Sequence, residues 1–465
     1  MLAFAVPPSI EALVFNSSAI PWSAPIRVSE PGGFAYSPFV VADEAGNLHA
    51  VWSENDTDPS EEDLQLETVY YARKDDTGWT TPIDIFIAPT GGQARVNRLR
   101  IDRAGRLHML WSQAPYMVYA TALAGNAASA RAWQARSIAE SVTYADLAVS
   151  SDDVLHIVYI LDRQGIYYIQ SQDNGAHWSS PTTIWRTPDT EHSSGSVRIE
   201  VGEDGVIHVA WGISGNDHGW KPMGIAYARS VDSGQTWEQT LTVMEGDNLP
   251  NIGFDQQGGV HLVWDNPAGS ILGRGHAWST DNGKTWQRVE RIFPGYRGQT
   301  LWPVIARDSA GTLHLVFAAN SPKSGESQVF HSMWSGNTWT EPKVISGNLF
   351  GGESPSLAIS EGNRLNVMWF SYRSQDYGIW YTAAEANAPS IAPRPLPTAA
   401  TVVLPSPKDT SSPTPSPASL AVLDHAALGG NTIVATTWTP TAAGILSCLA
   451  VIGAAVSVRF LRRKR

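Results

Sequence analysis

Six histidines recur at nearly even spacing along the chain, and histidine is a common metal ligand. Each is followed by two apolar residues and an aromatic residue, as in a buried strand. A metal ion needs ring nitrogens within about 2.1 Å of itself, whereas equivalent positions on stacked sheets lie about 10 Å apart. We therefore predict no metal site, and we expect these strand positions to be satisfied between neighbouring sheets. The six are His49, His108, His156, His208, His261 and His314.

A second pattern places a carboxylate in three near-identical turns at 171–178, 230–237 and 279–286, which we call the Asp turns. A calcium loop needs more carboxylates within about a dozen residues. Asp instead closes a turn on its own backbone, Gly takes a positive φ, and Trp buries a large apolar face. Looser copies lie at 75–79 and 335–339. We predict structural roles for Asp173, Gly175, Trp178, Asp232, Gly234, Trp237, Asp281, Gly283 and Trp286.

These patterns divide the chain into seven units of about fifty residues, with Asn366 in the histidine position of the last unit. Each unit shows four short strands separated by turn signals, which is typical of a propeller blade. The last unit lacks its fourth strand, and the segment 20–29 matches the fourth strand of the unit before it. We therefore predict an all-β, seven-bladed β-propeller closed by the N-terminal strand, with six blades as the alternative.

Composition excludes some partners. The formal net charge of -12 argues against nucleic acid. A single cysteine, Cys448, excludes an internal disulfide framework. No pattern points to a cofactor, and the sequence leaves the oligomeric state open.

Both ends of the chain differ from the repeats. Residues 1–19 read as a truncated signal or a disordered start. Residues 386–425 form a Pro/Ser/Thr-rich linker, expected to be an extended stalk. Residues 436–461 are apolar enough for one transmembrane helix, and the basic tail 462–465 marks the cytoplasmic side. We expect a single-pass cell-membrane protein whose propeller, 20–385, faces outward.

The Asp turns resemble the Asp box, or bacterial neuraminidase repeat, of sialidase-type propellers, over about residues 20–385. In that family the boxes lie on the rim, away from the central funnel, and true sialidases have six blades. Three arginines hold the substrate carboxylate, a tyrosine activated by a glutamate is the nucleophile, and an aspartate is the acid/base. The family's first arginine lies in a Tyr-Arg-Ile-Pro-like motif, and the matching stretch here keeps Tyr36 and Pro38 without the arginine.

The resemblance suggests catalytic candidates. Asp58 or Asp63, in an acidic loop, stands where the acid/base would stand, and Tyr372 lies near the position of the family's late tyrosine. The same acidic run is equally typical of a solvated surface loop.

Arginines near the expected funnel are candidates for binding an anionic sugar, because a guanidinium matches a carboxylate bidentately. Ordinary surface roles are the alternative. The candidates are Arg95, Arg98, Arg198, Arg297 and Arg373.

Three functions remain open. The first hypothesis is a membrane-anchored recognition module for glycans or another anionic surface polymer. The second is an exo-α-sialidase-type glycoside hydrolase. The third is a non-catalytic scaffold for protein interactions.

Overall fold

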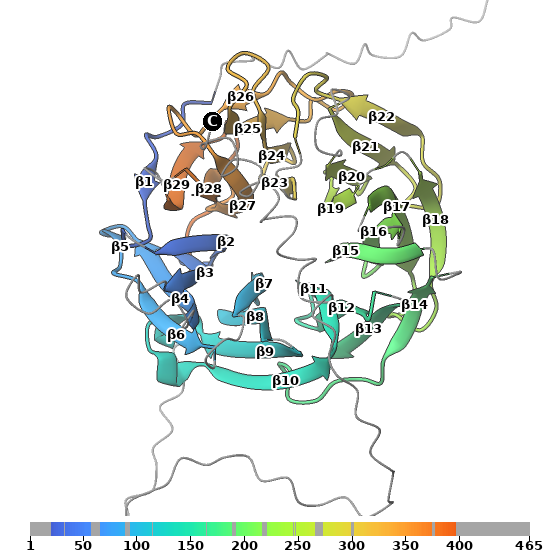
Figure 1. Cartoon of the computed structure of the whole chain (residues 1–465), viewed down its shortest axis with the longest axis horizontal. Coiled ribbons are helices and arrows are strands. Elements are labelled where there is room, and N and C mark those ends of the chain that lie inside the picture. The colour runs from blue at the N-terminus through green and yellow to red at the C-terminus, as the bar shows by residue number, and fades with distance from the viewer. Residues whose placement is uncertain are drawn as a thin grey trace, which may run out of the picture. The chain divides into compact units, whose positions relative to one another are not determined.

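Seven antiparallel sheets surround a central axis as the blades of a propeller (Figure 1). The computed structural model describes residues 20–31, 33–56, 66–88, 94–113, 115–163, 165–187, 192–215, 221–244, 246, 248–265, 273–298, 302–373 and 377–396. The predicted seven-bladed fold is confirmed, and the six-bladed alternative is wrong. Asp58 and Asp63, the segment 1–19, the expected transmembrane helix and the basic tail lie outside these residues.

The blades follow one another in chain order, and the innermost strand of each comes first. Blade 1 contains β2 (Phe34–Ala42), β3 (Leu48–Asp56), β4 (Leu66–Asp75), β5 (Gly78–Trp79) and β6 (Ile83–Ile87); blade 2 contains β7 (Arg95–Ile101), β8 (Arg106–Gln113), β9 (Tyr116–Leu123) and β10 (Gln134–Glu140), with 3₁₀ helices η1 (Ala124–Asn126) and η2 (Ala130–Ala132). Blade 3 contains β11 (Val142–Val149), β12 (Leu155–Leu161), β13 (Gly165–Ser171) and β14 (Thr182–Arg186); blade 4 contains β15 (His192–Val201), β16 (Ile207–Gly215), β17 (Lys221–Ser230) and β18 (Glu238–Val243). Blade 5 contains β19 (Asn248–Phe254), β20 (Val260–Asp265), β21 (Arg274–Ser279) and β22 (Arg288–Ile292); blade 6 contains β23 (Val304–Arg307), β24 (Leu313–Asn320), β25 (Ser327–Met333) and β26 (Lys343–Val344); blade 7 contains β27 (Gly352–Ser360), β28 (Arg364–Ser371), β29 (Gly378–Glu385) and β1 (Ile26–Arg27).

Burial follows the position of a strand within its blade. The second strand of blade 4, β16, is buried along its whole length because neighbouring blades cover both of its faces. This explains its continuous apolar run, which lacks the alternation of a half-exposed strand. The outer strand of blade 2, β10, is exposed at most positions.

The N-terminal strand closes the ring, as predicted. β1 pairs antiparallel with β29, with Ile26 opposite Tyr381. The ring of Trp22, just before β1, packs edge-on against His331 of blade 6 at 5.2 Å between centroids. Sequence-distant ends of the chain thus share one sheet.

The same aromatic contact couples every pair of neighbouring blades. A Trp on the outer part of each blade packs on a Tyr or His from the third strand of the preceding blade. The seven pairs are Trp22–His331, Trp79–Tyr381, Trp133–Tyr71, Trp178–Tyr119, Trp237–Tyr168, Trp286–Tyr227 and Trp339–His276. Three of these Trp close the Asp turns, and two close the looser copies, so the repeated tryptophans hold the blades together.

The six histidines find their partners within their own blades, which corrects our expectation that they are satisfied between blades. In blade 2, His108 Nδ1 lies 2.6 Å from the hydroxyl oxygen of Tyr119, and Nε2 lies 3.1 Å from Asp102 Oδ2. It is the tyrosine that reaches the next blade, since its hydroxyl donates to the carbonyl of Asn174 at 3.0 Å. The error arose because equivalent histidines lie on second strands, whose partners are the flanking strands of the same sheet.

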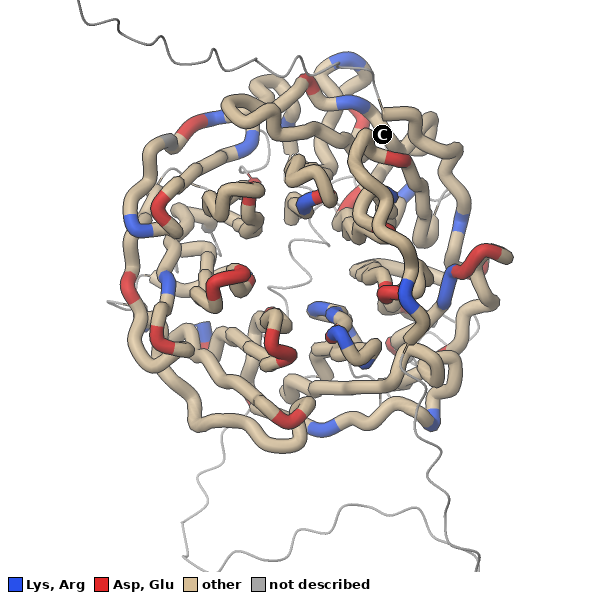
Figure 2. The backbone as a smooth tube through the Cα atoms, turned by 180° about the vertical axis from the view of Figure 1, so that it is seen from behind, with Lys and Arg blue, Asp and Glu red and all other residues tan. Residues whose placement is uncertain are grey.

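The first part of the expected linker packs on the ring. After β29, residues 386–396 cross the face that is seen in Figure 2, where the Arg394 amide donates to the carbonyl of Glu44 at 2.6 Å. The Ile391 amide donates to the carbonyl of Glu361, and Leu396 joins the core of blades 1 and 2. Among the described residues, no helix is both long and apolar enough to span a membrane.

Candidate functional site

The inner strands place one residue each at the same level around the axis, and we call this set the axial tier. Each member lies opposite a residue of the second strand in its own blade. That residue comes two positions after the repeat histidine, or after Asn366 in blade 7. The members are Phe39, Arg98, Asp146, Arg198, Asn251, Val304 and Ser356. The charges of the tier are therefore gathered in blades 2, 3 and 4.

Arg98 and Asp146 form a buried, bidentate ion pair between blades 2 and 3. Arg98 donates through Nε to Asp146 Oδ1 and through an Nη to Oδ2 at 2.9 Å. Oδ2 also accepts the backbone N–H of Ile199 in blade 4 at 3.0 Å. Burial alone would raise the pKa of Asp146, but the charges of Arg98 and Arg198 hold it below its usual value. One carboxylate thus ties three blades together at the axis.

Arg198 is a buried cation that this carboxylate does not contact. Its side chain donates to the carbonyl of Val197 at 3.1 Å, and within the described part of the chain its Nε has no hydrogen-bond partner. Trp302 packs on it, with the guanidinium carbon 4.3 Å from the ring centroid. Burial, and next the charge of Arg98, lower the pKa of Arg198 to about 9.

Trp302 reaches this site from the far side of the ring. It lies two residues before β23 of blade 6, yet its ring contacts Arg198 of blade 4 and Tyr144 of blade 3. The chain segment that leads into blade 6 therefore meets the tier at the axis. Trp302 is half-buried there, and the guanidinium of Arg198 lies over its ring.

A second level of charge lies one step further along the inner strands. Arg100, two residues after Arg98, donates to Glu200, two residues after Arg198, and also to the carbonyl of Leu147 at 3.0 Å. The pair connects blades 2 and 4 across the inner strand of blade 3. Because Arg100 and Glu200 neutralise each other, the two levels together hold one more cation than anion.

This arrangement favours an anionic ligand. A buried cation without a paired anion is costly, and Arg198 keeps an N–H without an acceptor among the described residues. A carboxylate or sulfate oxygen would supply both the charge and the missing hydrogen bond. The chemistry that the tier supports is therefore recognition of an anion beside an aromatic face.

Tyr36 lies in the stretch that resembles the sialidase arginine motif, and Arg95 of β7 faces it across the seam between blades 1 and 2. The Tyr36 hydroxyl is hydrogen-bonded to Glu67. Burial, and then the charge of Glu67, raise the pKa of Tyr36 well above its usual value, whereas Arg95 opposes this rise. Glu67 also accepts the backbone N–H of Ala94 at 2.6 Å. The Tyr–Glu pair therefore fastens the seam, and it does not generate a tyrosinate.

The Ser-Pro step in this stretch is a repeated backbone device. Ser37, Leu249 and Ser354 each precede a proline and have φ of 51°, 59° and 46°. The pairing of their strands shifts register at these points. Such bulges redirect inner strands at the rims of barrels and near functional sites. The Pro38 match to the sialidase motif thus reflects the repeat, since it recurs where no arginine is expected.

The remaining candidates lie in blades 6 and 7. Arg297 is exposed, and its backbone bonds to Asn320. Arg373 pairs with Glu326 of blade 6, and its guanidinium carbon is 5.3 Å from the centroid of the Phe350 ring. The Tyr372 amide donates to the carbonyl of Gly351. The structure brings Arg98 and Arg198 together at the axis, whereas Arg297 and Arg373 contact residues of blades 6 and 7.

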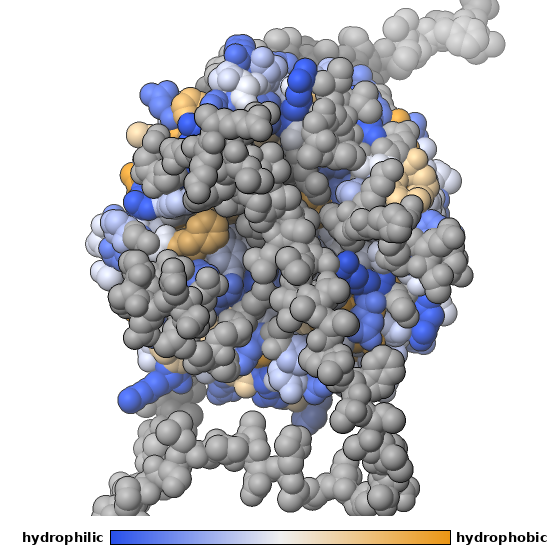
Figure 3. Space-filling view, viewed as in Figure 1, coloured by the Kyte–Doolittle hydropathy of each residue, from blue (hydrophilic) through white to orange (hydrophobic). Residues whose placement is uncertain are grey.

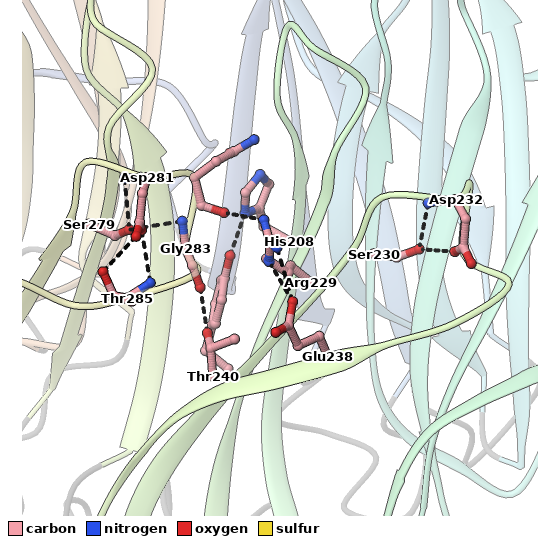
Figure 4. Close-up of polar contacts among 12 residues, drawn as sticks. His208, Arg229, Ser230, Asp232, Glu238, Thr240, Ser279, Asp281, Gly283 and Thr285 are labelled. Carbon is pink, nitrogen blue, oxygen red and sulfur yellow. Dashed lines mark hydrogen bonds and ion pairs between the residues drawn. The ribbon is translucent and has the colours of Figure 1, made fainter.

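The Asp turns join neighbouring blades, and their carboxylates are fully occupied (Figure 4). Asp281 Oδ1 accepts the Ser279 hydroxyl and the Thr285 amide, each at 2.8 Å, and Oδ2 accepts the Thr285 hydroxyl. Burial alone would raise the pKa of Asp281, but these hydrogen bonds lower it to about 2. The Thr240 hydroxyl of blade 4 donates to the carbonyl of Gly283 in the turn. In the structure this turn thus contacts the outer strand of the preceding blade.

On the face shown in Figure 3, hydrophilic side chains dominate the described residues, and hydrophobic ones are scattered. Acidic turns between first and second strands surround the axis on the opposite face (Figure 2). A cavity of about 740 Å³ opens there between blades 4, 5 and 6, and Arg100 and Arg307 line it. Both arginines are paired with glutamates, so the cavity presents no orphan charge from them.

Comparisons with known proteins identify the fold. No family model matches the chain. A protein of unknown function from Dyadobacter fermentans superposes with a TM-score of 0.51 at 15% identity, covering 79% of this chain and 99% of that one. An ulvan lyase of family PL25, bound to -[GlcA(1-4)Rha3S]-, gives 0.56 at 13% identity, covering 78% and 96%. The NanB sialidase of Streptococcus pneumoniae also matches, with a TM-score of 0.43 and 11% identity over 79% and 70% of the two chains. These likenesses show the fold alone, a β-propeller.

Curated relatives with sequence similarity to part of this chain include a xyloglucanase. The xyloglucanase Xgh74A of Acetivibrio thermocellus is 28% identical over 188 residues. The match spans 36% of this chain and about a fifth, 21%, of that protein.

Several functional candidates could not be recognised in the sequence. Asp146 is a single charge in the apolar inner strand β11, and that isolation was the available signal. The sequence signal for Trp302 was weaker: it precedes a proline, as Ser37 does. The partnership of Arg98, Asp146, Arg198 and Trp302 depends on four different blades, and no spacing encodes it.

Proposed function

We propose that this chain is a carbohydrate-active propeller that recognises an acidic glycan at the axial tier. The observation that carries the proposal is the buried Arg198 guanidinium, which lacks a paired anion and lies against Trp302. Arg98 is held beside it by Asp146. A sugar carboxylate or sulfate would accept hydrogen bonds from Arg198 while the sugar ring stacks on an aromatic face.

The similar proteins support the carbohydrate class. They include a xyloglucanase and an ulvan lyase. The polar described surface supports a hydrophilic ligand. We favour recognition over catalysis, since burial, and next the charge of Glu67, raise the pKa of Tyr36, which disfavours a nucleophilic tyrosinate at that position.

Binding of the full-length chain to a defined oligouronate, measured by calorimetry, tests the proposal. A neutral xyloglucan oligosaccharide of equal length is the ligand control. We expect Arg198→Met to weaken oligouronate binding by at least tenfold, because a charge-assisted hydrogen bond contributes about 1.5–3 kcal/mol. Arg307→Gln, at an exposed ion pair on the opposite face, is the matched control and should bind normally.

Arg198→Met also separates a binding role from a structural one. Removal of a buried, unpaired cation should leave the free energy of unfolding unchanged or raise it. Lost binding with retained stability supports the proposal. Normal oligouronate binding by the folded variant would refute it.

A separate assay tests the alternative function, a sialidase-type glycoside hydrolase. Release of the fluorophore from a sialic-acid aryl glycoside, abolished by Tyr372→Phe or Arg373→Ala, would favour the hydrolase. Asp58→Asn and Asp63→Asn test the acid/base candidates in the same assay. If the chain neither binds nor turns over any member of a broad glycan array, the scaffold function gains support.

We also propose that the chain is anchored by residues 436–461, with the propeller outside and 462–465 in the cytoplasm. The apolar run and the basic tail support this orientation. Protease treatment of intact cells should release a propeller-sized fragment. Cleavage only after lysis would refute it.

A further inference from the structure

Four blades share a carboxylate–histidine pair at the turn between their first and second strands. The aspartate lies six residues before the histidine and accepts hydrogen bonds from the turn. Its other oxygen lies 3.0–3.3 Å from histidine Nε2. The pairs are Asp43–His49, Asp102–His108, Asp255–His261 and Asp308–His314.

Blades 3 and 4 keep the histidine but lack this carboxylate. Ser150 and Gly202 occupy the aspartate position, six residues before His156 and His208. Both imidazoles are buried, at 5% and 0% exposed, and neither Nε2 has a partner among the described residues. In blade 7, Ser360 occupies the aspartate position and Asn366 the histidine position, and the Asn366 side chain donates a hydrogen bond to Ser360. Blades 3 and 4 are thus the two in which the repeat histidine of the second strand lacks its aspartate.

The titratable groups around His156 do not replace the missing carboxylate. Nδ1 lies 2.7 Å from the Tyr168 hydroxyl. Asp152 is the nearby acid, and its Oδ1 accepts the Ser150 hydroxyl at 2.6 Å. Burial lowers the pKa of His156 to about 4, against a weak opposing effect of Asp152.

His208 has the same surroundings in blade 4. Nδ1 lies 2.6 Å from the Tyr227 hydroxyl, and the ring meets Phe254 of blade 5 edge-on. Asp204 faces it, but that carboxylate accepts the Val206 amide and the Asn282 side chain. Arg229 also faces it and is itself paired with Glu238. Burial lowers the pKa of His208 to about 4, with Asp204 opposing and Arg229 reinforcing the shift.

The two tyrosines connect these histidines to the next blade. A Cβ added to Gly234 would lie 2.1 Å from the Tyr168 ring, and one added to Gly283 would lie 2.0 Å from the Tyr227 hydroxyl. The tyrosines are therefore packed directly against the Asp turns of blades 4 and 5. A neutral imidazole can accept the tyrosine hydroxyl at Nδ1, but a protonated one cannot. Protonation would also leave a buried charge beside an apolar ring.

We propose that blades 3 and 4 form an acid-sensitive sector, in which protonation of His156 and His208 loosens the seams to the Asp turns of blades 4 and 5. In blades 1 and 2 an aspartate oxygen lies beside Nε2 of the matching histidine and can compensate an added proton. The sensitive seams flank β15, which carries Arg198. Mild acid should therefore open the ring locally beside the axial tier.

The direction follows from proton linkage. A histidine that titrates near 6.5 when its seam opens, and near 4 when closed, binds more protons in the open form between these values. The closed seam is fully favoured above about pH 6.5 and loses stability as the pH falls toward 4. At pH 5.0 the opening equilibrium should rise on the order of thirtyfold for each histidine, relative to pH 7.5.

Hydrogen exchange of the full-length chain, followed by mass spectrometry at pH 7.5 and 5.0 and corrected for intrinsic rates, tests the proposal. Peptides from β16, β17 and the Asp turn 279–286 should gain exchange at pH 5.0. Peptides from β8 and β9 of blade 2, where Asp102 pairs with His108, should not. This comparison needs no variant, so a folding defect cannot obscure it.

Reciprocal variants sharpen the test. Ser150→Asp combined with Gly202→Asp should remove the acid response, because each places a carboxylate near Nε2. Gly202 accepts a Cβ if the end of the Asp204 side chain moves. Asp102→Ser should create an acid response in blade 2. Equal acid responses in blades 2 and 4 of the unmodified chain would overturn the proposal, as would an unchanged response in a folded Ser150→Asp/Gly202→Asp variant.

Discussion

Asp146 is the residue whose substitution most directly tests the electrostatics of the axial tier. Its side chain is fully buried and bonded to Arg98, and it faces the charge of Arg198. Asp146→Asn keeps an oxygen that can accept the Ile199 amide but removes the negative charge. Two buried cations would then have no compensating anion at this level.

The expected loss is about 4 kcal/mol. Breaking a buried ion pair by removing one partner costs about 3–5 kcal/mol. A contact pair at an effective dielectric constant of about 20 gives a similar figure. With about 2 cal/mol/K of unfolding entropy per residue, this lowers the Tm of a ring spanning residues 20–385 by about 5 °C.

Thermal and denaturant unfolding of the full-length chain measure this effect. Glu203→Gln is the control, because Glu203 is 83% exposed in its ion pair with Arg307 and should lose less than about 1 kcal/mol. In an Arg198→Met background, Asp146→Asn should cost about 1 kcal/mol less, since one cation is gone. A loss no larger than that of Glu203→Gln, or an identical cost in both backgrounds, would refute the reasoning.

Three further predictions concern the seams. Trp22→Ala removes the contact to His331 and should lower the free energy of unfolding by about 2 kcal/mol. Denaturant unfolding would show this as a lower midpoint. An unchanged midpoint would mean that the β1 pairing alone closes the ring. Gly234→Ala should lower the Tm more than Gly205→Ala does. Both glycines have φ near 80°, but only Gly234 faces a tyrosine ring within van der Waals distance. Equal decreases in Tm would contradict the close packing. Burial lowers the pKa values of His156 and His208 to about 4. The free energy of unfolding should therefore be highest above about pH 6.5 and lower by about 2 kcal/mol per histidine at pH 5. A Tm that does not change with pH would contradict this prediction.

The sequence predicts the architecture well because the architecture repeats. The histidine strand recurs in six of the seven units, and the Asp turn with its looser copies recurs in five, so their spacing reveals the blades. Even the closing strand was predictable, since 20–29 carries the same Trp and Pro as its repeat counterpart 337–346. Any feature present in most units leaves such a signal.

The candidate site was predictable only in part, because it breaks the repeat. Arg98 and Arg198 were identified as possible ligands, but their partners Asp146 and Trp302 come from other blades. The histidine partners were misassigned for a related reason. His108 and Tyr119 lie eleven residues apart on adjacent strands, so their contact depends on register within the sheet.

Ring closure by β1 has a consequence for the order of folding. The segment that pairs with β29 is synthesised first, whereas its partner is among the last parts of the propeller to be made. Before β29 is synthesised, Trp22 and β1 have no sheet to join. After its synthesis, β29 has an unpaired edge until β1 pairs with it. We therefore expect closure to be the final and slowest step of propeller folding, since it joins the most distant parts of the ring. A circular permutant that carries 20–29 after residue 385 would convert this long-range step into a local hairpin.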